Sequence, residues 1–368
     1  MRPRRRDILS GLAASAVFGP AAQAGVPHPS LREIADRRQL LYGSAMKSGQ
    51  LKNDPEFTES VLREANSIVA EYEMKRLIIQ KQKGRWDFTG ADKLMRFALR
   101  HRLAMRGHPL VWYHSNPPWL AEEMFFRPDE KRHLIDYIER VAGRYRAKIH
   151  SWDVVNECVN PQEGGPDGMR IKNIWMQAFG EQYIDTAFHA AREADPHALR
   201  FYGDFGVEHS SRWHATRRRA VLRLLERLLA RNVPIDGFGI QGHLKAFRHP
   251  FVERELEEFM AEISGMGLKI MVSELDVADR AGPADIQIRD EAVATLTRRF
   301  LEVVMDNPAS IGVLTWGLSD RYSWLSVYPE YKWPDGSKSR GLPLDENLER
   351  KPMWHAIADA MRRRPPVR

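Results

Sequence analysis

The sequence predicts an α/β protein built as a single (β/α)8 TIM barrel, in which eight parallel strands alternate with helices. Two observations lead to this fold class. Short apolar runs recur along the chain, and longer stretches with helical character separate them. Two of those runs also carry a carboxylate at or near the C-terminal end, Glu157 and Glu274, where a buried strand needs no charge. The carboxyl ends of barrel strands form the active site, which accounts for both positions.

The predicted strands are the eight apolar runs. They cover residues 41–45, 74–79, 104–112, 149–155, 199–205, 237–241, 268–272 and 311–316. Eight such strands favour a closed barrel over an open sheet, because closure leaves no strand edge unprotected. Right-handed crossovers then place every connecting helix on the outside.

The predicted helices are the stretches between these runs. They cover residues 54–71, 91–101, 131–145, 175–193, 214–231, 252–266 and 286–307, and residues 351–363 close the chain. No low-complexity linker, short repeat or composition shift interrupts the alternation. Residues 25–368 are therefore predicted to form one catalytic domain, a length that (β/α)8 barrels commonly reach.

Composition narrows the class of protein. Hydrophobic residues make up 43% and charged residues 29% of the 368 positions, which is typical of a globular protein and argues against disorder or a membrane span. The formal charge of +7 comes from the two ends, because residues 2–7 contribute +3 and residues 362–368 contribute +4. A charge confined to the ends predicts no nucleic-acid partner.

The first residues have the pattern of an export signal. Three arginines at 4–6 precede the mildly apolar residues 11–18, and Ala22-Gln23-Ala24 resembles a cleavage site. Residues 1–24 are thus predicted to be a twin-arginine-type signal that sends the protein to the periplasm or the exterior. The only cysteine, Cys158, is expected to be a small core residue, because no base is positioned beside it.

Polar residues at the predicted strand ends indicate the chemistry. They are Ser44, Lys75, His108, Trp112, Asn156, Glu157, Asp204, Gln241, His243, Glu274, Asp276 and Trp316. Carboxylates, amides, imidazoles and indoles suit a sugar, and two carboxyl groups can together cleave a glycosidic bond. A metal hydrolase is the alternative, but no closely spaced histidine motif supports it. No phosphate-binding glycine loop is present either, so the sequence predicts neither a metal nor a cofactor.

Five motifs at these strand ends resemble one family. They are WDVVNE at 152–157, VSELD at 272–276, GHPLVW at 107–112, GIQGH at 239–243 and TWG at 315–317. Taken in order they resemble glycoside hydrolase family 10, the endo-β-1,4-xylanases, over nearly the whole chain after the signal. The resemblance implies a retaining endo-β-1,4-glycanase that hydrolyses xylan by double displacement.

The resemblance also implies a role for each residue. Glu274 matches the nucleophile and Glu157 matches the general acid/base. Asn156 would bind the sugar 2-hydroxyl, while His243, oriented by Asp276, would hydrogen-bond the nucleophile. The implied substrate-binding residues are Glu71, Lys75, His108, Trp112, Gln241 and Trp316. Trp324 is also predicted to bind substrate by stacking on a sugar, and packing under its own loop is the alternative.

The chain departs from the family pattern on one side of the expected cleft. Tyr72 stands where the family usually has asparagine, and Tyr113 and Ser115 replace a histidine and a glutamine. Apart from these, Gly203 stands where an asparagine commonly precedes the aspartate of the fifth strand, here Asp204. An enzyme for another β-linked polymer, such as a bacterial exopolysaccharide, therefore remains an alternative to a xylanase. A non-catalytic glycan-binding barrel is the second alternative. A polysaccharide is the only partner expected, and the protein is expected to be a monomer.

Overall fold

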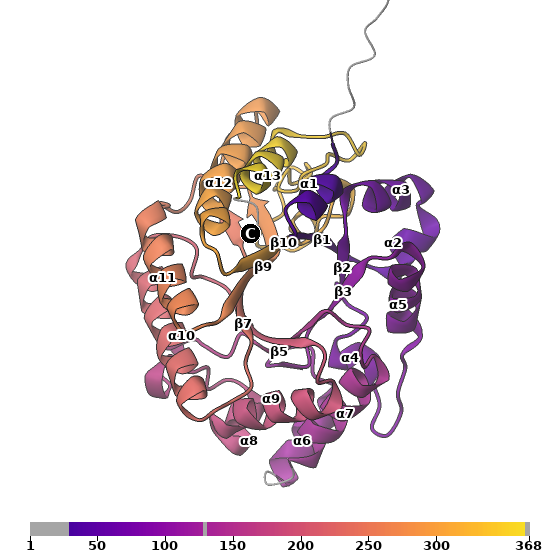
Figure 1. Cartoon of the computed structure of the whole chain (residues 1–368), viewed down its shortest axis with the longest axis vertical. Coiled ribbons are helices and arrows are strands. Elements are labelled where there is room, and N and C mark those ends of the chain that lie inside the picture. The colour runs from indigo at the N-terminus through magenta and orange to yellow at the C-terminus, as the bar shows by residue number, and fades with distance from the viewer. Residues whose placement is uncertain (1–28, 128–130, 365–368) are drawn as a thin grey trace, which may run out of the picture.

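The computed structural model describes residues 29–127 and 131–364, and the predicted export signal lies outside them. A ring of parallel strands stands inside a ring of helices (Figure 1). The strands are β1 Leu41–Met46, β2 Ser67–Ala70, β3 Ala104–Gly107, β4 Val111–Trp112, β5 Ser151–Asn156, β6 Leu199–Asp204, β7 Gly237–Ile240, β8 His243–Lys245, β9 Lys269–Ala278 and β10 Ser310–Thr315.

The sheet closes on itself, which confirms the predicted fold class. β1 pairs with β10 through Leu41 and Gly312, and β9 pairs with β10, so the ring has no free edge. Eight strands form the ring, while the short β4 and β8 pair with β5 and β9 beyond it. Every ladder is parallel, so all carboxyl ends meet at one end of the barrel.

Helices follow the strands around the outside. The α-helices are α1 Leu31–Arg37, α2 Ser48–Asn53, α3 Pro55–Glu64, α4 Arg76–Ile79, α5 Thr89–His101, α6 Pro118–Phe126, α7 Arg132–Arg144, α8 Ile174–Phe179, α9 Gln182–Ala194, α10 Arg212–Ala230, α11 Glu253–Gly265, α12 Ile286–Asp306 and α13 Pro352–Arg363. Short 3-10 turns are η1 Pro161–Glu163, η2 Pro166–Gly168, η3 Asp320–Tyr322 and η4 Trp324–Ser326.

The second strand is not where the sequence predicted it. The predicted strand at 74–79 is wrong, because its second half is the one-turn helix α4. The true strand β2 is a buried run of four residues that the prediction had placed inside the helix at 54–71. Periodicity cannot separate a short buried strand from a helix end, and only pairing with β1 and β3 decides.

Two further predicted elements are interrupted. The strand at 104–112 splits into β3 and β4, because Pro109 lies between them and has no N–H for a ladder. The helix at 175–193 splits into α8 and α9 at Gly180, whose φ of 59° with ψ of −163° is accessible to glycine.

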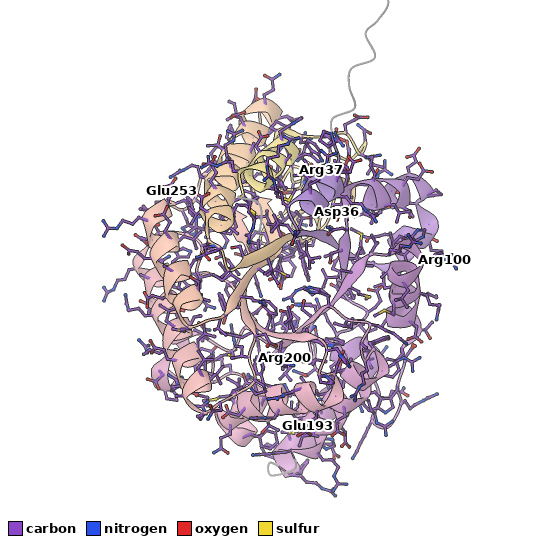
Figure 2. The ribbon with its side chains drawn as sticks, viewed as in Figure 1. Asp36, Arg37, Arg100, Glu193, Arg200 and Glu253 are labelled. Carbon is purple, nitrogen blue, oxygen red and sulfur yellow. The ribbon has the colours of Figure 1, made fainter. Side chains whose placement is uncertain are left out.

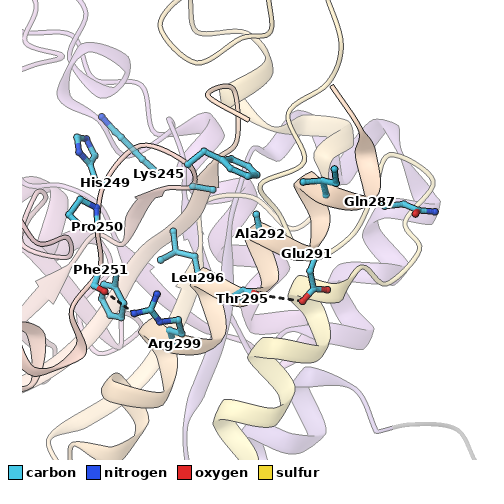
Figure 3. A pocket seen from close by; sticks show the side chains of 13 residues that line it. Lys245, His249, Pro250, Phe251, Gln287, Glu291, Ala292, Thr295, Leu296 and Arg299 are labelled. Atoms are coloured by element: carbon cyan, nitrogen blue, oxygen red, sulfur yellow. Dashed lines mark hydrogen bonds between the residues drawn. The ribbon is translucent and has the colours of Figure 1, made fainter. Parts of the chain in front are cut away.

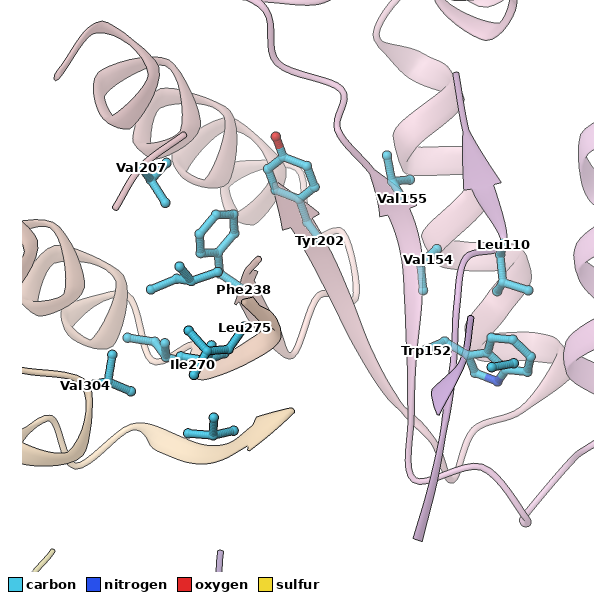
Figure 4. Packing of buried hydrophobic residues seen from close by; sticks show 14 of the residues in the cluster. Leu110, Trp152, Val154, Val155, Tyr202, Val207, Phe238, Ile270, Leu275 and Val304 are labelled. Atoms are coloured by element: carbon cyan, nitrogen blue, oxygen red, sulfur yellow. The ribbon is translucent and has the colours of Figure 1, made fainter. Parts of the chain in front are cut away.

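The core has two layers, because successive strand residues face opposite sides. Val69, Met271 and Leu314 belong to a small cluster that fills the barrel. Their sequence neighbours belong to the large cluster between strands and helices. In that outer layer Tyr202 meets Phe238 edge to face, with ring centroids 5.4 Å apart (Figure 4).

A buried carboxylate ties the two ends of the described chain together. Glu64 Oε2 accepts hydrogen bonds from the Leu31 N–H and the Trp354 indole, both at 3.0 Å. Glu64 Oε1 accepts from Arg350 at 2.9 Å and Arg63 at 3.0 Å. One side chain thus joins α1, α3 and α13 where the barrel closes.

Charged side chains cover the outer helices. Arg100 on α5 and Glu193 on α9 are exposed and lie at the rim of the molecule (Figure 2). Among residues 29–127 and 131–364, none of the helices combines the length and the apolar character that crossing a bilayer requires.

Candidate active site

Both carboxylates lie at the carboxyl end of the barrel, because β5 ends just before Glu157 and the pairing of β9 with β7 ends at Val272, two residues before Glu274. Glu157 follows β5 directly, and its N–H donates to the Gly203 carbonyl at 2.8 Å. Glu274 lies within β9, and its N–H donates to the Gln241 carbonyl at 2.8 Å. The Gln241 amide also donates to Glu157 Oε1 at 2.9 Å. Gln241 therefore links the two acids, whose exposed fractions are only 8% and 5%.

The surroundings push the two pKa values apart. Burial raises the pKa of Glu157, and the negative charges of Asp204 and Glu274 add to this effect. Burial acts on Glu274 too, but the imidazoles of His108 and His243 and the Lys75 ammonium outweigh it and lower the pKa of Glu274. One carboxyl group is thus kept as a proton donor and the other as an anion, which is the arrangement that divides acid from nucleophile.

One oxygen of Glu274 contacts His243, which is held in turn by Asp276. His243 Nε2 lies 3.3 Å from Glu274 Oε2, and His243 Nδ1 lies 2.9 Å from Asp276 Oδ1. Burial alone would lower the pKa of His243, but Asp276 and Glu274 raise it well above its ordinary value. The other oxygen, Glu274 Oε1, has no hydrogen-bond partner among the described residues. It is the oxygen available for attack.

A second chain of polar groups was not predicted from the sequence. Asp153 accepts from His108 Nδ1 at 2.9 Å and forms a very short ion pair with Arg106. His108 Nδ1 also lies 3.8 Å from Glu274 Oε1. The sequence feature that could have predicted these contacts lies in the motif at 152–157, where the charged residue Asp153 interrupts an apolar run.

Asn156 lies between the acid and its neighbours. Its Nδ2 donates to Glu157 Oε1 at 3.3 Å, and its Oδ1 accepts from Gln241 at 3.4 Å. A Cβ on Gly203 would come within 2.8 Å of that Oδ1. Glycine at 203 therefore leaves the room that this Asn156 position requires.

Aromatic rings surround the ammonium of Lys75. Its Nζ lies 4.7 Å from the ring centroid of Tyr72, 5.1 Å from Trp112 and 5.9 Å from Trp316. The ring of Trp316 also meets His108 edge to face at 5.1 Å. These rings and the cation thus lie next to Glu274, whose charge opposes the burial that lowers the pKa of Lys75.

Glu71 and Trp324 are each held by a neighbouring side chain. Glu71 pairs with Lys47 at 2.9 Å, a partner that the sequence did not suggest. Trp324 donates its indole N–H to Asp276 Oδ2 at 2.5 Å, and its ring lies 5.5 Å from that of His243. Trp324 is thereby fixed against the pair that holds Glu274.

The structure brings the predicted site residues together, with two exceptions from the wider set of strand ends. Asp204 pairs with Arg217 at 2.5 Å and accepts from the Tyr202 hydroxyl, so it acts on Glu157 through its charge and not through a hydrogen bond. The Ser44 hydroxyl is buried in β1 and has no hydrogen-bond partner within residues 29–127 and 131–364. Cys158 is buried as expected, and burial raises the pKa of its thiol.

No group of three or more histidine, cysteine or acidic side chains in the described part of the chain is arranged to hold a metal ion. A cavity of about 620 Å³ lies outside the barrel between the loop that follows β8 and helix α12 (Figure 3). Its lining includes Lys245, Phe251 and Arg299, and none of the predicted site residues.

Comparison with known proteins identifies the family. The model of glycosyl hydrolase family 10 matches residues 30–360. Endo-1,4-beta-xylanase B of Thermotoga neapolitana is 29% identical, covering 94% of this chain and 95% of that protein. A thermostable celloxylanase of Thermoclostridium stercorarium is 32% identical over 91% of this chain and 88% of that protein.

Solved structures agree in fold. Native xylanase 10B from Thermotoga maritima superposes with a TM-score of 0.81 at 28% identity, covering 90% of this chain and 98% of that one. Xylanase 10B from Thermotoga petrophila, solved with xylobiose, gives a TM-score of 0.81 at 26% identity, with 91% and 98% covered. The chain belongs to glycosyl hydrolase family 10.

Proposed function

We propose that this protein is an endo-1,4-β-xylanase that cleaves internal bonds of xylan with retention of configuration. The observation that carries the proposal is the opposite pKa shift of two adjacent buried carboxyl groups, Glu157 upward and Glu274 downward. The names of the relatives supply the substrate, because they are described as xylanases and a celloxylanase.

In the first step Glu274 Oε1 attacks the anomeric carbon while Glu157 protonates the leaving oxygen. His243 steadies the other oxygen of Glu274 at 3.3 Å, so a single oxygen is presented to the sugar. The bond that forms is a glycosyl ester, and the bond that breaks is the glycosidic bond.

In the second step Glu157 changes from acid to base. Esterified Glu274 carries no charge, so one of the effects that raise the pKa of Glu157 disappears. Glu157 then takes a proton from water, whose oxygen attacks the anomeric carbon from the face opposite the ester. The bond between that carbon and the Glu274 oxygen breaks, and Glu274 leaves as a carboxylate. Asn156, Gln241 and the rings of Trp112, Trp316 and Trp324 are proposed to hold the sugar.

The experiment is product analysis on a panel of soluble β-glycans, with xylan, cellulose derivatives and bacterial exopolysaccharides side by side. We expect reducing ends from xylan, and the first product seen by NMR should be the β-anomer. Release from another polymer only would assign the alternative substrate, and binding without release would indicate a glycan-binding barrel. An early α-anomer would exclude the retaining mechanism.

Location and assembly form a separate proposal. Residues 1–24 are proposed to direct twin-arginine export, and residues 25–368 to act as a monomer. Replacement of Arg5 and Arg6 by lysine should leave the precursor in the cytoplasm. Light scattering of the mature protein should give the mass of one chain.

A further inference from the structure

Glu157 has an unusual backbone conformation. Its φ is 56°, a left-handed region that residues other than glycine rarely adopt. Such a conformation costs free energy and persists only where neighbouring groups impose it. Because β5 ends at Asn156, this turn sets the direction in which the Glu157 carboxyl points.

One arginine contacts two consecutive carbonyl groups at this turn, the first through its side chain and the second through its main chain. Arg170 Nε donates to the Glu157 carbonyl at 2.8 Å, and the Arg170 N–H donates to the Cys158 carbonyl at 2.8 Å. Arg170 is 6% exposed, and its Nη1 lies 3.4 Å from Glu163. The remaining face of the guanidinium is covered by Tyr113, whose ring centroid lies 3.9 Å away.

We propose that Arg170 is a positioning residue for the acid/base, which holds Glu157 in its left-handed conformation and so aims its carboxyl group. Tyr113, one of the departures from the family pattern, keeps water from the bond by covering the guanidinium. This inference rests on the proposed role of Glu157 as proton donor. Without Arg170 the Glu157 carbonyl loses its buried donor, and the turn can relax toward negative φ with the side chain moved away.

The test uses a property that only a misplaced acid changes, namely dependence on the leaving group. A dinitrophenol leaves without protonation, whereas a sugar needs the proton from Glu157. Arg170→Gln should lower kcat/KM on xylo-oligosaccharides about 100-fold, within the range of general acid catalysis. On a dinitrophenyl β-xylobioside kcat/KM should stay within about threefold of wild type, because proton donation is not needed.

Azide gives a second readout on the same variant. On the dinitrophenyl substrate we expect the second step, where Glu157 acts as base, to limit kcat, because a good leaving group makes the first step fast. Azide needs no base, so it should restore kcat of Arg170→Gln and yield the β-glycosyl azide.

Arg200 supplies a matched control. Its Nε donates to the Pro234 carbonyl at 2.8 Å and its Nη2 pairs with Asp236 at 2.7 Å. Arg200 is the second residue of β6, so it lies at the opposite end of that strand from the site. Arg200→Gln therefore removes the same kinds of bond, and it should show no dependence on the leaving group.

Equal losses on both substrates for Arg170→Gln, or no loss on either, would overturn the inference. If Arg170→Gln does not fold, Tyr113→Ala exposes the guanidinium to water and should give the same selective loss to a smaller degree. If Tyr113→Ala lost activity equally on both substrates, or on neither, the inference would also be overturned. A wild-type protein that releases no reducing ends from xylan would instead refute the proposed function.

Discussion

The pair formed by His243 and Asp276 offers the sharpest test of the site electrostatics. The proposed change is Asp276→Asn, which keeps the shape of the side chain and removes its charge. Asp276 and Glu274 together raise the pKa of His243, so the imidazole is cationic and donates from both nitrogens. Beside a neutral amide, His243 keeps its proton on Nδ1 and turns a lone pair toward Glu274 Oε2, 3.3 Å away.

The size of the effect follows from this lost bond. A hydrogen bond to a charged group contributes about 1.5–3 kcal/mol. At about 1.4 kcal/mol per pKa unit, the pKa of Glu274 should rise by about one to two units. In the wild-type protein the pKa of Glu274 is lowered, and activity is lost when the pH falls through it because Glu274 must be ionised to attack. A higher pKa of Glu274 in the variant should therefore move the acidic limb to higher pH.

The assay is the pH dependence of kcat/KM on a soluble xylo-oligosaccharide. We expect the alkaline limb, which reports protonated Glu157, to stay in place. Asp279→Asn is the control. Asp279 is as buried as Asp276 and directly follows β9, the strand that contains Asp276, but it accepts a hydrogen bond from Arg289 at 2.7 Å outside the site. An unmoved acidic limb in Asp276→Asn, or an equal movement in both variants, would refute the reasoning.

Three other outcomes are expected. Glu274→Ala should abolish turnover with unchanged circular dichroism, and azide should then yield the α-glycosyl azide; full activity would remove Glu274 as nucleophile. Tyr72→Asn should raise kcat/KM on unbranched xylo-oligosaccharides about twofold to tenfold by adding one hydrogen bond, and no change would contradict that role. Glu64→Gln should lower the free energy of unfolding by about 3–5 kcal/mol at neutral pH, because it breaks a buried ion pair. Burial raises the pKa of Glu64, but hydrogen bonds from Leu31 and Arg350 outweigh burial and lower it. The stability difference between wild type and Glu64→Gln should therefore become smaller as the pH falls through this pKa, because the wild-type carboxylate is then protonated.

The fold was predictable because its signal repeats. Seven of the eight predicted strands overlap a strand of the ring, since buried parallel strands are apolar on both faces. The second strand failed for a local reason, because β2 has only four residues and follows a strong helix without a turn signal. Strand β8 was missed because His243 and Lys245 are polar, and only pairing with β9 makes them a strand.

The site was predictable where position along a strand was enough. Parallel closure places Glu157, Glu274 and His243 together whatever their separation in sequence. Partners on loops were not predictable in this way. The bond from Arg170 to Glu157 depends on how a loop folds back over the strand end. The pair of Lys47 and Glu71 was missed for another reason, because both residues follow the paired ends of β1 and β2, and β2 had been predicted at the wrong place.

The departures from the family pattern have physical partners in this chain. Tyr113 packs on Arg170, and Gly203 makes room for Asn156. Tyr72 is 49% exposed, and its ring lies 5.0 Å from Lys47 and 4.7 Å from Lys75.

Such contacts couple the substitutions to their neighbours. Tyr72→Asn does not remove the ion pair between Lys47 and Glu71. The Glu71 carboxylate, which is proposed to bind the next sugar, therefore stays paired with Lys47. The gain from Tyr72→Asn should therefore be larger when Lys47→Ala is also present. We therefore expect Lys47, Glu71 and Tyr72 to act on specificity as a unit, because they contact one another. The departures leave Glu157 and Glu274, the proposed catalytic pair, in place.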